Sequence, residues 1–333
     1  MLTRRVNLKL TYNGADISHD IAASAISLSY DDHAGGKADE LEVQLEDRKG
    51  LWSGDWFPER GATLDATLQL TTSSTTEELP MGLFEIDEVE VGGPPSTVHI
   101  RAISVPASSS LRGEDKTRAW EKAKLSEIVA DIAGGASMQV MYDTVDDPLY
   151  DRVEQSEQTD LSFLQKLCSD AGLSLKVTGD TIVVFDDAKY ETLEPVLTIT
   201  KEAVTQYRGR AKTNEIYKAC KVEYHESKTK EGISYTFEAP NAPPSGRVLR
   251  INERVTTLAE AEKLAKKRLR QKNKEEQTFA VTIPGQTTLV AGVTVKVQGF
   301  GVFDGKYYVD KAAHRIGSGY TCALDLRKVL EGY

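Results

Sequence analysis

Residues 159–186, TDLSFLQKLCSDAGLSLKVTGDTIVVFD, carry the pattern that decides the fold of the central part of the chain. The first half places apolar residues at helical spacing, and Gly172 stands where that helix should stop. Two short apolar runs then flank Gly179 and Asp180, a turn signal that predicts a hairpin. A helix followed by two paired strands predicts a small α+β unit, which we expect to end near Pro195.

Cys168 lies inside this predicted helix, where a lone cysteine can be a nucleophile, a metal ligand or a core residue. It shares an apolar helix face with Leu161 and Leu164, so we expect it to face the core. Cys220 and Cys322 alternate in phase with apolar residues of predicted strands. A free cysteine on an apolar face behaves as a small hydrophobe, so we interpret all three as core residues.

Two catalytic alternatives remain open at this point. The order Cys168, His225, His314 superficially suits a cysteine peptidase, whose thiolate needs an imidazole to take its proton. The predicted helix, however, offers Cys168 neither exposure nor a cationic neighbour. The 51 Asp and Glu residues would also allow a glycosidase pair, but the sequence does not select one.

The residues that would form metal or phosphate sites do not have the required spacing. No histidines are paired as metal sites favour, and HExxH is absent; the five are His19, His33, His99, His225 and His314. DDHAGGKADE, residues 31–40, is better explained as a polar connection between strands. GGK at 35–37 lacks the flanking residues of a phosphate loop, and GFGVFDG at 299–305 is expected to be a hairpin connection.

The first hundred residues predict short strands separated by turns. Apolar and polar residues alternate in segments 6–12, 26–30, 41–45 and 64–70, which places the apolar residues of each segment on one face. Regular short strands of this kind are typical of an antiparallel barrel or sandwich. A second β-rich block occupies 278–333, so α+β material separates two β-rich blocks.

Residues 257–277 predict a helix. Thr257 and Glu260 match a capping box, and the apolar stripe comprises Leu258, Ala261, Leu264, Ala265 and Leu269. Residues 263–274 include seven Lys or Arg and no aromatic residue. We interpret this run as a solvated helix face with i,i+4 pairs rather than a nucleic-acid surface.

Length and charge limit the classes of function. A chain of 333 residues predicts two to four domains. The formal net charge of −10 argues against nucleic-acid binding as the main task. We see no apolar run long enough to span a bilayer, no signal peptide and no disulfide framework, so we expect synthesis in a cytoplasm. Without a catalytic constellation, the sequence favours a structural or assembly role.

The order of the segments resembles a known family. Residues 156–186 run from an acidic and polar lead through a Phe-Leu-x-x-Leu helix to a glycine stop and a hairpin, and they resemble phage late control protein D and related tail hub proteins. Residues 259–327 follow the same family's order of helix, strand, Pro-Gly, Asp-Gly hairpin and final strands. The spike proteins of type VI secretion share this hub plan. The resemblance covers about 150–330, and Cys168 stands where we expect a small residue such as alanine.

The resemblance implies a β-rich α+β fold with two tube-like antiparallel β-barrels and smaller α+β domains. By analogy, the first barrel spans about 1–106 and an α+β domain spans 107–199. The second barrel is split between 200–224 and 278–333, and 225–277 form an inserted hairpin-helix domain.

It also implies a homotrimer at the centre of a contractile baseplate, which adapts a sixfold tail tube to a threefold spike. The implied partners are the tail spike, tail tube, baseplate wedge and tape-measure proteins, and the implied place is the tail baseplate of the virion. The resemblance implies no enzyme activity, cofactor, specific nucleic-acid binding or membrane anchor, and it assigns no partner-binding residues. The alternatives are a tail-associated cell-wall hydrolase and a nucleic-acid module that uses Lys263–Lys274.

Overall fold

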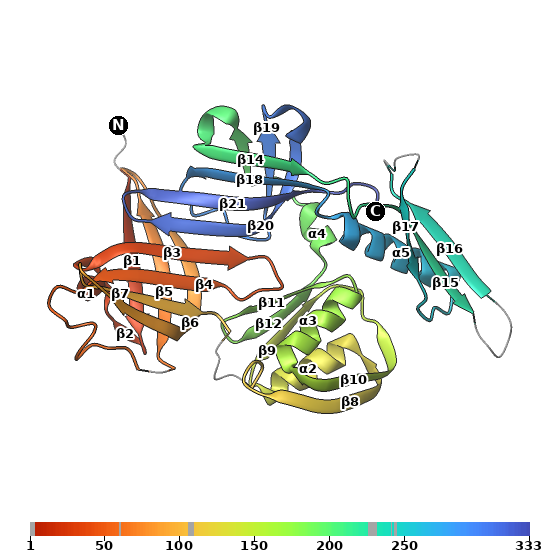
Figure 1. The fold of residues 1–333 in the computed structure, drawn as a ribbon, viewed down its shortest axis with the longest axis horizontal. Helices are drawn as coiled ribbons and strands as arrows, with labels where there is room; N and C mark the ends of the chain where they lie inside the picture. Colours follow the sequence, from red (N-terminus) through yellow and green to blue (C-terminus); the bar gives the residue numbers. More distant parts are fainter. Residues whose placement is uncertain (1–3, 60, 106–109, 226–231, 241, 243–244) are drawn as a thin grey trace.

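The computed structural model describes residues 4–59, 61–105, 110–225, 232–240, 242 and 245–333. Two β-rich units lie side by side, with an α+β unit below them and a smaller unit at one end (Figure 1). The β-rich α+β class predicted from the sequence is confirmed, and most strand pairs are antiparallel. Among the described residues, no helix has the length and apolar character needed to cross a membrane.

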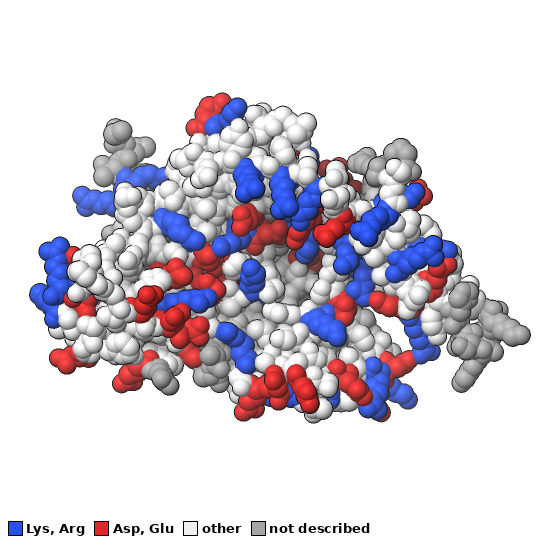
Figure 2. All heavy atoms as spheres, in the orientation of Figure 1, with Lys and Arg blue, Asp and Glu red and all other residues white. Residues whose placement is uncertain are grey.

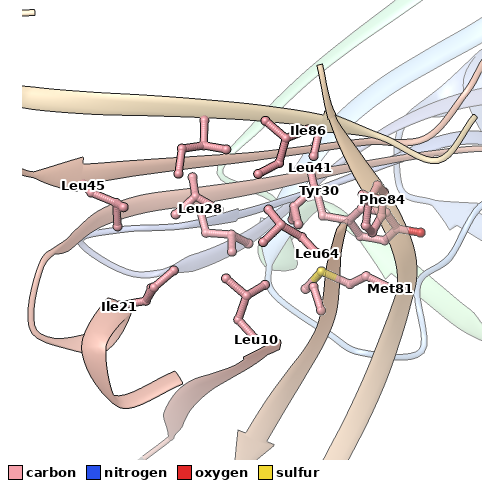
Figure 3. Packing of buried hydrophobic residues seen from close by; sticks show 14 of the residues in the cluster. Leu10, Ile21, Leu28, Tyr30, Leu41, Leu45, Leu64, Met81, Phe84 and Ile86 are labelled. Atoms are coloured by element: carbon pink, nitrogen blue, oxygen red, sulfur yellow. The ribbon is translucent and has the colours of Figure 1, made fainter. Parts of the chain in front are cut away.

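The first β unit contains seven strands and a short helix. These are β1 (Arg5–Tyr12), β2 (Ala15–Asp16), α1 (Ser18–Ala22), β3 (Ala25–His33), β4 (Glu40–Glu46), β5 (Thr63–Thr71), β6 (Thr76–Gly92) and β7 (Thr97–Ile103). Alternation places every second side chain of β5 inside the unit, as predicted for Leu64, Ala66, Leu68 and Leu70. Figure 3 shows Leu64 of β5 within a cluster of side chains from other strands, which include Leu10, Leu41 and Phe84.

The α+β unit follows from residue 115. Its elements are β8 (Asp115–Lys124), α2 (Leu125–Gly135), β9 (Gln139–Asp143), β10 (Leu149–Thr159), α3 (Asp160–Asp170), β11 (Ser174–Thr178), β12 (Thr181–Phe185) and α4 (Asp187–Glu191). The predicted helix and hairpin are therefore confirmed as α3, β11 and β12. The Thr159 hydroxyl caps α3 by accepting from the amide of Ser162, and Gly172 has the positive φ of +69° that ends the helix.

The second β unit is built from distant segments of the chain. It comprises β13 (Leu197–Thr200), β14 (Gln206–Ala211), β18 (Gln277–Pro284), β19 (Thr294–Gln298), β20 (Gly305–Ile316) and β21 (Tyr320–Lys328). Residues 299–305 connect β19 to β20 through a 3-10 turn, as the hairpin prediction required. This unit has its own buried core, centred on Phe279, Val295 and Leu324.

One hydrogen-bonded sheet joins the two β units. Its strand order is β14-β18-β21-β20-β3-β4-β7-β6-β5-β1-β2, and β19 and β13 pair off this path. The joint is the antiparallel pairing of β3 with β20, from Leu28 opposite Ile316 to His33 opposite Lys311. Each unit curls around its own core, although no ladder closes β1 onto β3 in the described part of the chain.

The fourth unit packs a helix on a three-stranded sheet. It contains β15 (Tyr217–His225), β16 (Gly232–Glu238), β17 (Arg247–Ile251) and α5 (Leu258–Asn273). Cys220 of β15 packs with Ala265 and Leu269 of α5 in a small separate core. Residues 241, 243 and 244, between β16 and β17, lie outside the described residues.

Two details of the predicted helix at 257–277 are corrected. The Thr257 hydroxyl accepts from the Glu260 amide as expected, but the Glu260 carboxylate accepts from the amide and hydroxyl of Thr256 rather than from Thr257. Leu258 is 57% exposed and does not belong to the buried stripe. It is the first residue of α5, and the buried residues of this helix begin at Ala261.

Candidate functional site

The junction of the units contains a half-buried lysine that binds two buried carboxylates. Lys176 of β11 places its Nζ 2.5 Å from Asp32 Oδ1 and 3.1 Å from Asp39 Oδ2, and it donates to the carbonyl oxygen of His33. The second oxygen of Asp32 accepts from the amide of Ala291, at 2.7 Å. These contacts join the α+β unit to both β units, because the lysine, the two aspartates and the amide come from different units.

The excess of carboxylates over lysines at this junction has an electrostatic consequence. Burial raises the pKa of Asp39 to about 6. The ammonium group of Lys176 lowers this pKa, but it does not cancel the rise, and the negative charge of Asp32 adds to it. Burial alone would lower the pKa of Lys176, but the two aspartates together raise it. The acids of segment 31–40 therefore act as ion-pair partners. Among the residues that the structure describes, no group of three or more His, Cys, Asp or Glu is arranged to hold a metal ion.

A second junction surrounds Arg327, whose side chain is only 1% exposed. Its Nε lies 2.8 Å from Asp310 and its Nη2 lies 3.0 Å from Asp187 of α4. Glu191, also of α4, pairs with Arg327 and with Arg270 of α5, the latter at 2.5 Å. A buried guanidinium requires such partners, because an unpaired charge in the interior is strongly destabilising. Helix α4 therefore connects the second β unit to α5.

The basic run on α5 makes tertiary ion pairs, which corrects the prediction of a solvated face with i,i+4 pairs. Lys263 and Lys267 both pair with Asp146, which precedes β10 in the α+β unit. Among the described residues, only the Lys266–Glu262 pair, at 2.9 Å, has the predicted i,i+4 spacing. Local spacing cannot reveal these pairs, because their partners lie on a neighbouring unit.

Arg268 extends the same contact by pairing with Asp170 of α3, at 3.3 Å, and with Glu253, at 2.5 Å. On the face seen in Figure 2, basic and acidic side chains are interleaved where α5 meets the α+β unit, and they do not form a patch of one sign. Nucleic-acid binding requires unpaired cations along a phosphate backbone, so this arrangement disfavours that alternative.

A cysteine and a histidine do meet, but not the pair that the sequence order suggested. His314 Nδ1 lies 3.3 Å from Cys322 Sγ and 2.9 Å from Tyr320 Oη, and its Nε2 lies 3.0 Å from the carbonyl oxygen of Leu289. The Nε2–H must donate to that carbonyl, so Nδ1 is an acceptor. Burial raises the pKa of Cys322 and lowers that of His314, so both groups are held neutral.

The sequence analysis does not predict this buried network, because His314 and Cys322 match neither the spacing of a metal site nor the order of a peptidase. The available signal was the short turn at 317–319, which makes His314 and Cys322 directly opposite partners across the β20–β21 hairpin. A neutral, fully satisfied network stabilises a fold and does not generate a nucleophile.

Cys168, the first catalytic candidate, is a core residue as predicted. Its side chain is fully buried among apolar residues of α2, α3 and β11. Burial raises its pKa to about 12, which disfavours the thiolate that a peptidase needs. Cys220 is likewise buried and has its pKa raised to about 11, mainly by burial. The side chain of His225 lies outside the described part of the chain.

The two ends of the long sheet present strand edges. Strand β14 pairs only with β18 among the described residues, and its Tyr207 is 47% exposed. At the other end, β2 pairs only with Thr11 and Tyr12 of β1, which leaves the rest of that edge of β1 without a strand partner in the part described. Such edges are templates for pairing with another chain.

Comparison with known proteins agrees with this architecture. The family model described as phage tail baseplate hub (GPD) matches residues 85–320. The probable baseplate hub protein of Escherichia phage 186 is 23% identical over 95% of this chain and 91% of its own length.

Solved structures share the fold at low identity. A tail protein from Neisseria meningitidis superposes with a TM-score of 0.71 at 13% identity, over 97% of this chain and 96% of that one. A component of the Escherichia coli type VI secretion system superposes with a TM-score of 0.61 at 14% identity, over 98% of this chain and 78% of that one. The chain therefore belongs to the phage tail baseplate hub family, and its place is the baseplate of the virion tail.

Proposed function

We propose that three copies of this chain form a ring around the tail axis, to which each copy contributes its two β units. Six similar units would then face the sixfold tail tube, while the threefold symmetry of the trimer would match the spike. The observation that carries the proposal is the β3–β20 ladder, which fixes two curled β units side by side in one chain (Figure 1). Repeated head-to-tail contacts generate a closed ring when the rotation between neighbouring copies closes.

The strand edges of β14 and β1 are the proposed contacts between neighbouring copies. They lie at opposite ends of the long sheet, so an edge of one copy can pair with the other edge of the next. Pairing in a ring would remove exposed edges, which otherwise favour aggregation. The type VI secretion component with the same fold is described as similar to tail proteins of phage T4, which supports a shared ring plan.

We further propose four domains, close to the boundaries expected from the resemblance. The separate cores support units at about 1–106 and 107–196, and a second β unit that includes β13 and 278–333, so the boundary lies a few residues before the expected 199. We place the start of the inserted unit before β15, near residue 212, because Cys220 packs with α5 rather than with the second β unit. The insertion is then continuous from there to about residue 277.

We propose that the chain acts by assembly and not by catalysis. The buried, neutral states of Cys168, Cys322 and His314 support this view. The remaining expected partners are the spike, tube, wedge and tape-measure proteins. The formal net charge of −10 is consistent with a ring past which DNA would move without adhering, because like charges repel.

The test is the mass of the purified chain, alone and with the spike protein of the same particle, by size-exclusion chromatography with light scattering. We expect a 3:3 complex whose averaged electron-microscopy images show six similar densities in a ring. A complex in which the chain remains a monomer with both spike and tube protein present would overturn the proposal. A control variant with Asp151→Asn, far from either edge strand, should assemble like the wild type.

A further inference from the structure

The first β unit has an apolar cavity at one end of its core, with a volume of about 450 Å³. Its walls come from the inner faces of five strands, from α1 and the residue before it, and from the loop at 51–59. The buried or half-buried apolar residues that line it are Leu10, Ile17, Ile21, Val43, Trp52, Leu64, Ile86 and Ile100. Figure 3 shows Ile21 on α1 approaching the side of the cluster where Leu10 lies. A cavity of this size is typical of sites that bind a ligand or an anchoring side chain.

The lip of the cavity is aromatic. Trp52 is buried and packs edge-on against Trp56, with ring centroids 5.3 Å apart. Trp56 is 44% exposed and Phe57 is 49% exposed, and both line the cavity. Tryptophan and phenylalanine supply much of the contact area in protein recognition, and two adjacent rings left half in water offer a surface that an occupant would cover.

The same lip is acidic. Asp20, Asp55 and Glu59 line the cavity, and all three are exposed. Among the residues that the structure describes, no Lys or Arg lines the cavity and none of these carboxylates makes an ion pair. Carboxylates attract a cation, and the face of a tryptophan ring attracts one as well. The charge of the lip therefore selects a positively charged occupant.

We propose that this cavity binds a segment of a partner protein in which one large apolar side chain is followed by Lys or Arg. The apolar side chain would fill the cavity, and the cation would lie between Asp20, Asp55 and the ring of Trp56. A chain segment explains the lip better than a small molecule, because an enclosed ligand would leave the outer faces of Trp56 and Phe57 in water. The proposal does not depend on the trimer, since one copy supplies the whole site.

The test uses three blocked dipeptides, acetyl-Phe-Lys-amide, acetyl-Phe-Gln-amide and acetyl-Phe-Glu-amide. The readout is the NMR signal of the indole N–H groups. The chain has three tryptophans, and Trp120 lies against the core of the α+β unit, so it serves as an internal reference. We expect Trp52 and Trp56 to shift and Trp120 to stay, and the Phe-Lys peptide to bind about fivefold or more tightly than the Phe-Glu peptide.

Variants separate the apolar and charged parts of the site. Ile100→Phe fills the cavity and should abolish binding of all three peptides. The double variant Asp20→Asn, Asp55→Asn should still bind the peptides but lose the preference for Lys, and because both side chains are exposed it should fold normally. Asp65→Asn, at an exposed position of β5 that does not line the cavity, is the matched control and should keep both binding and preference.

Three results would overturn the proposal. The first is no shift of Trp52 or Trp56 at millimolar peptide. The second is equal binding of the Lys and Glu peptides by the wild type. The third is association between copies of the chain that Ile100→Phe abolishes and the peptides do not affect, which would assign the cavity to a second copy. The double variant keeps the test decisive even if Ile100→Phe does not fold.

Discussion

Gly285 lies against the ring of Tyr320 so closely that a Cβ atom at this position would be 2.3 Å from the ring carbons. The Gly285 amide also donates to the Tyr320 carbonyl oxygen, at 2.9 Å. The ring cannot move away without cost, because its hydroxyl is bound to His314. The contact between β18 and the β20–β21 hairpin therefore requires glycine here.

Gly285→Ala should lower the free energy of unfolding by about 1–3 kcal/mol, since overpacking displaces Tyr320 and its hydrogen bond. Urea unfolding monitored by circular dichroism measures the change. Gly134→Ala in α2 is the control: a Cβ there meets nothing within 4 Å. It should be neutral or stabilise the helix by about 0.5–1 kcal/mol. Equal losses in the two variants would contradict the explanation.

Asp39→Asn should stabilise the protein at pH 8 and have little effect at pH 4. The pKa of Asp39 is raised to about 6 in the folded state by burial, against about 4 in an unfolded chain. The folded state therefore binds the proton more tightly, so the stabilisation from protonation is present below about pH 4 and is lost as the pH rises through 6. Removing the charge should recover roughly 1–3 kcal/mol at pH 8. Unfolding free energies at the two pH values test this.

Asp32→Asn is the control for Asp39→Asn. Asp32 is the closer partner of Lys176 and also accepts from Ala291, so its loss should destabilise the protein at pH 8. The two variants should thus have opposite signs at pH 8. If Asp39→Asn were as destabilising as Asp32→Asn, the account of two carboxylates competing for one lysine would be wrong.

Asp146→Asn should loosen the contact between α5 and the α+β unit. Burial would raise the pKa of Asp146, but Lys263 and Lys267 lower it overall, so the paired carboxylate stabilises the fold above about pH 4 and the effect is lost as the pH falls. We expect a loss of about 1–2 kcal/mol and faster hydrogen exchange along α5.

Asp151→Asn is the matched control for Asp146→Asn. Asp151 and its partner Arg254 are 74% and 58% exposed, so water screens their attraction. Its replacement should change the stability by less than about 0.5 kcal/mol. Rising salt should reduce the difference between wild type and Asp146→Asn, and a difference that persisted in high salt would argue against ion pairing as its cause.

Cys168→Ala should cost about 1 kcal/mol and leave the assembly of the chain unchanged, since a fully buried sulfur is replaced by a small cavity. Thermal unfolding measures the stability, light scattering measures the assembly, and incubation with purified cell wall tests for hydrolase activity. Wall lysis by the wild type that Cys168→Ala abolishes would revive the hydrolase alternative. Cys220→Ala, at an equally buried cysteine of another unit, controls for a loss that is purely structural.

The sequence predicts which side of an element faces the core, but not which element lies opposite. Alternation in β5 and helical spacing in α3 were sufficient to identify buried residues, because burial repeats with the local geometry of the backbone. Lys176 and Asp32 are 144 positions apart, and no local pattern marks them as partners. For the same reason the sequence predicts a solvated basic face for α5, whereas in the structure this face pairs with carboxylates of the α+β unit.

Arg327 is a charged residue whose burial the sequence does not predict. It lies near the end of a strand pattern, where a charged residue usually reaches into water. Its burial depends on carboxylates from α4 and β20, at positions 187, 191 and 310. The aromatic and acidic lip at 51–59 is similar, since only the curvature of the sheet brings the loop beside α1.

The ladder between β3 and β20 also has a mechanical meaning. Its paired residues run antiparallel from Leu28 opposite Ile316 to His33 opposite Lys311, so a pull along the strands loads their hydrogen bonds in shear and all at once. Bonds loaded together resist far more force than bonds that open one after another. Under such a pull the two β units should therefore move together, and any yielding should begin at the charged contacts of α5.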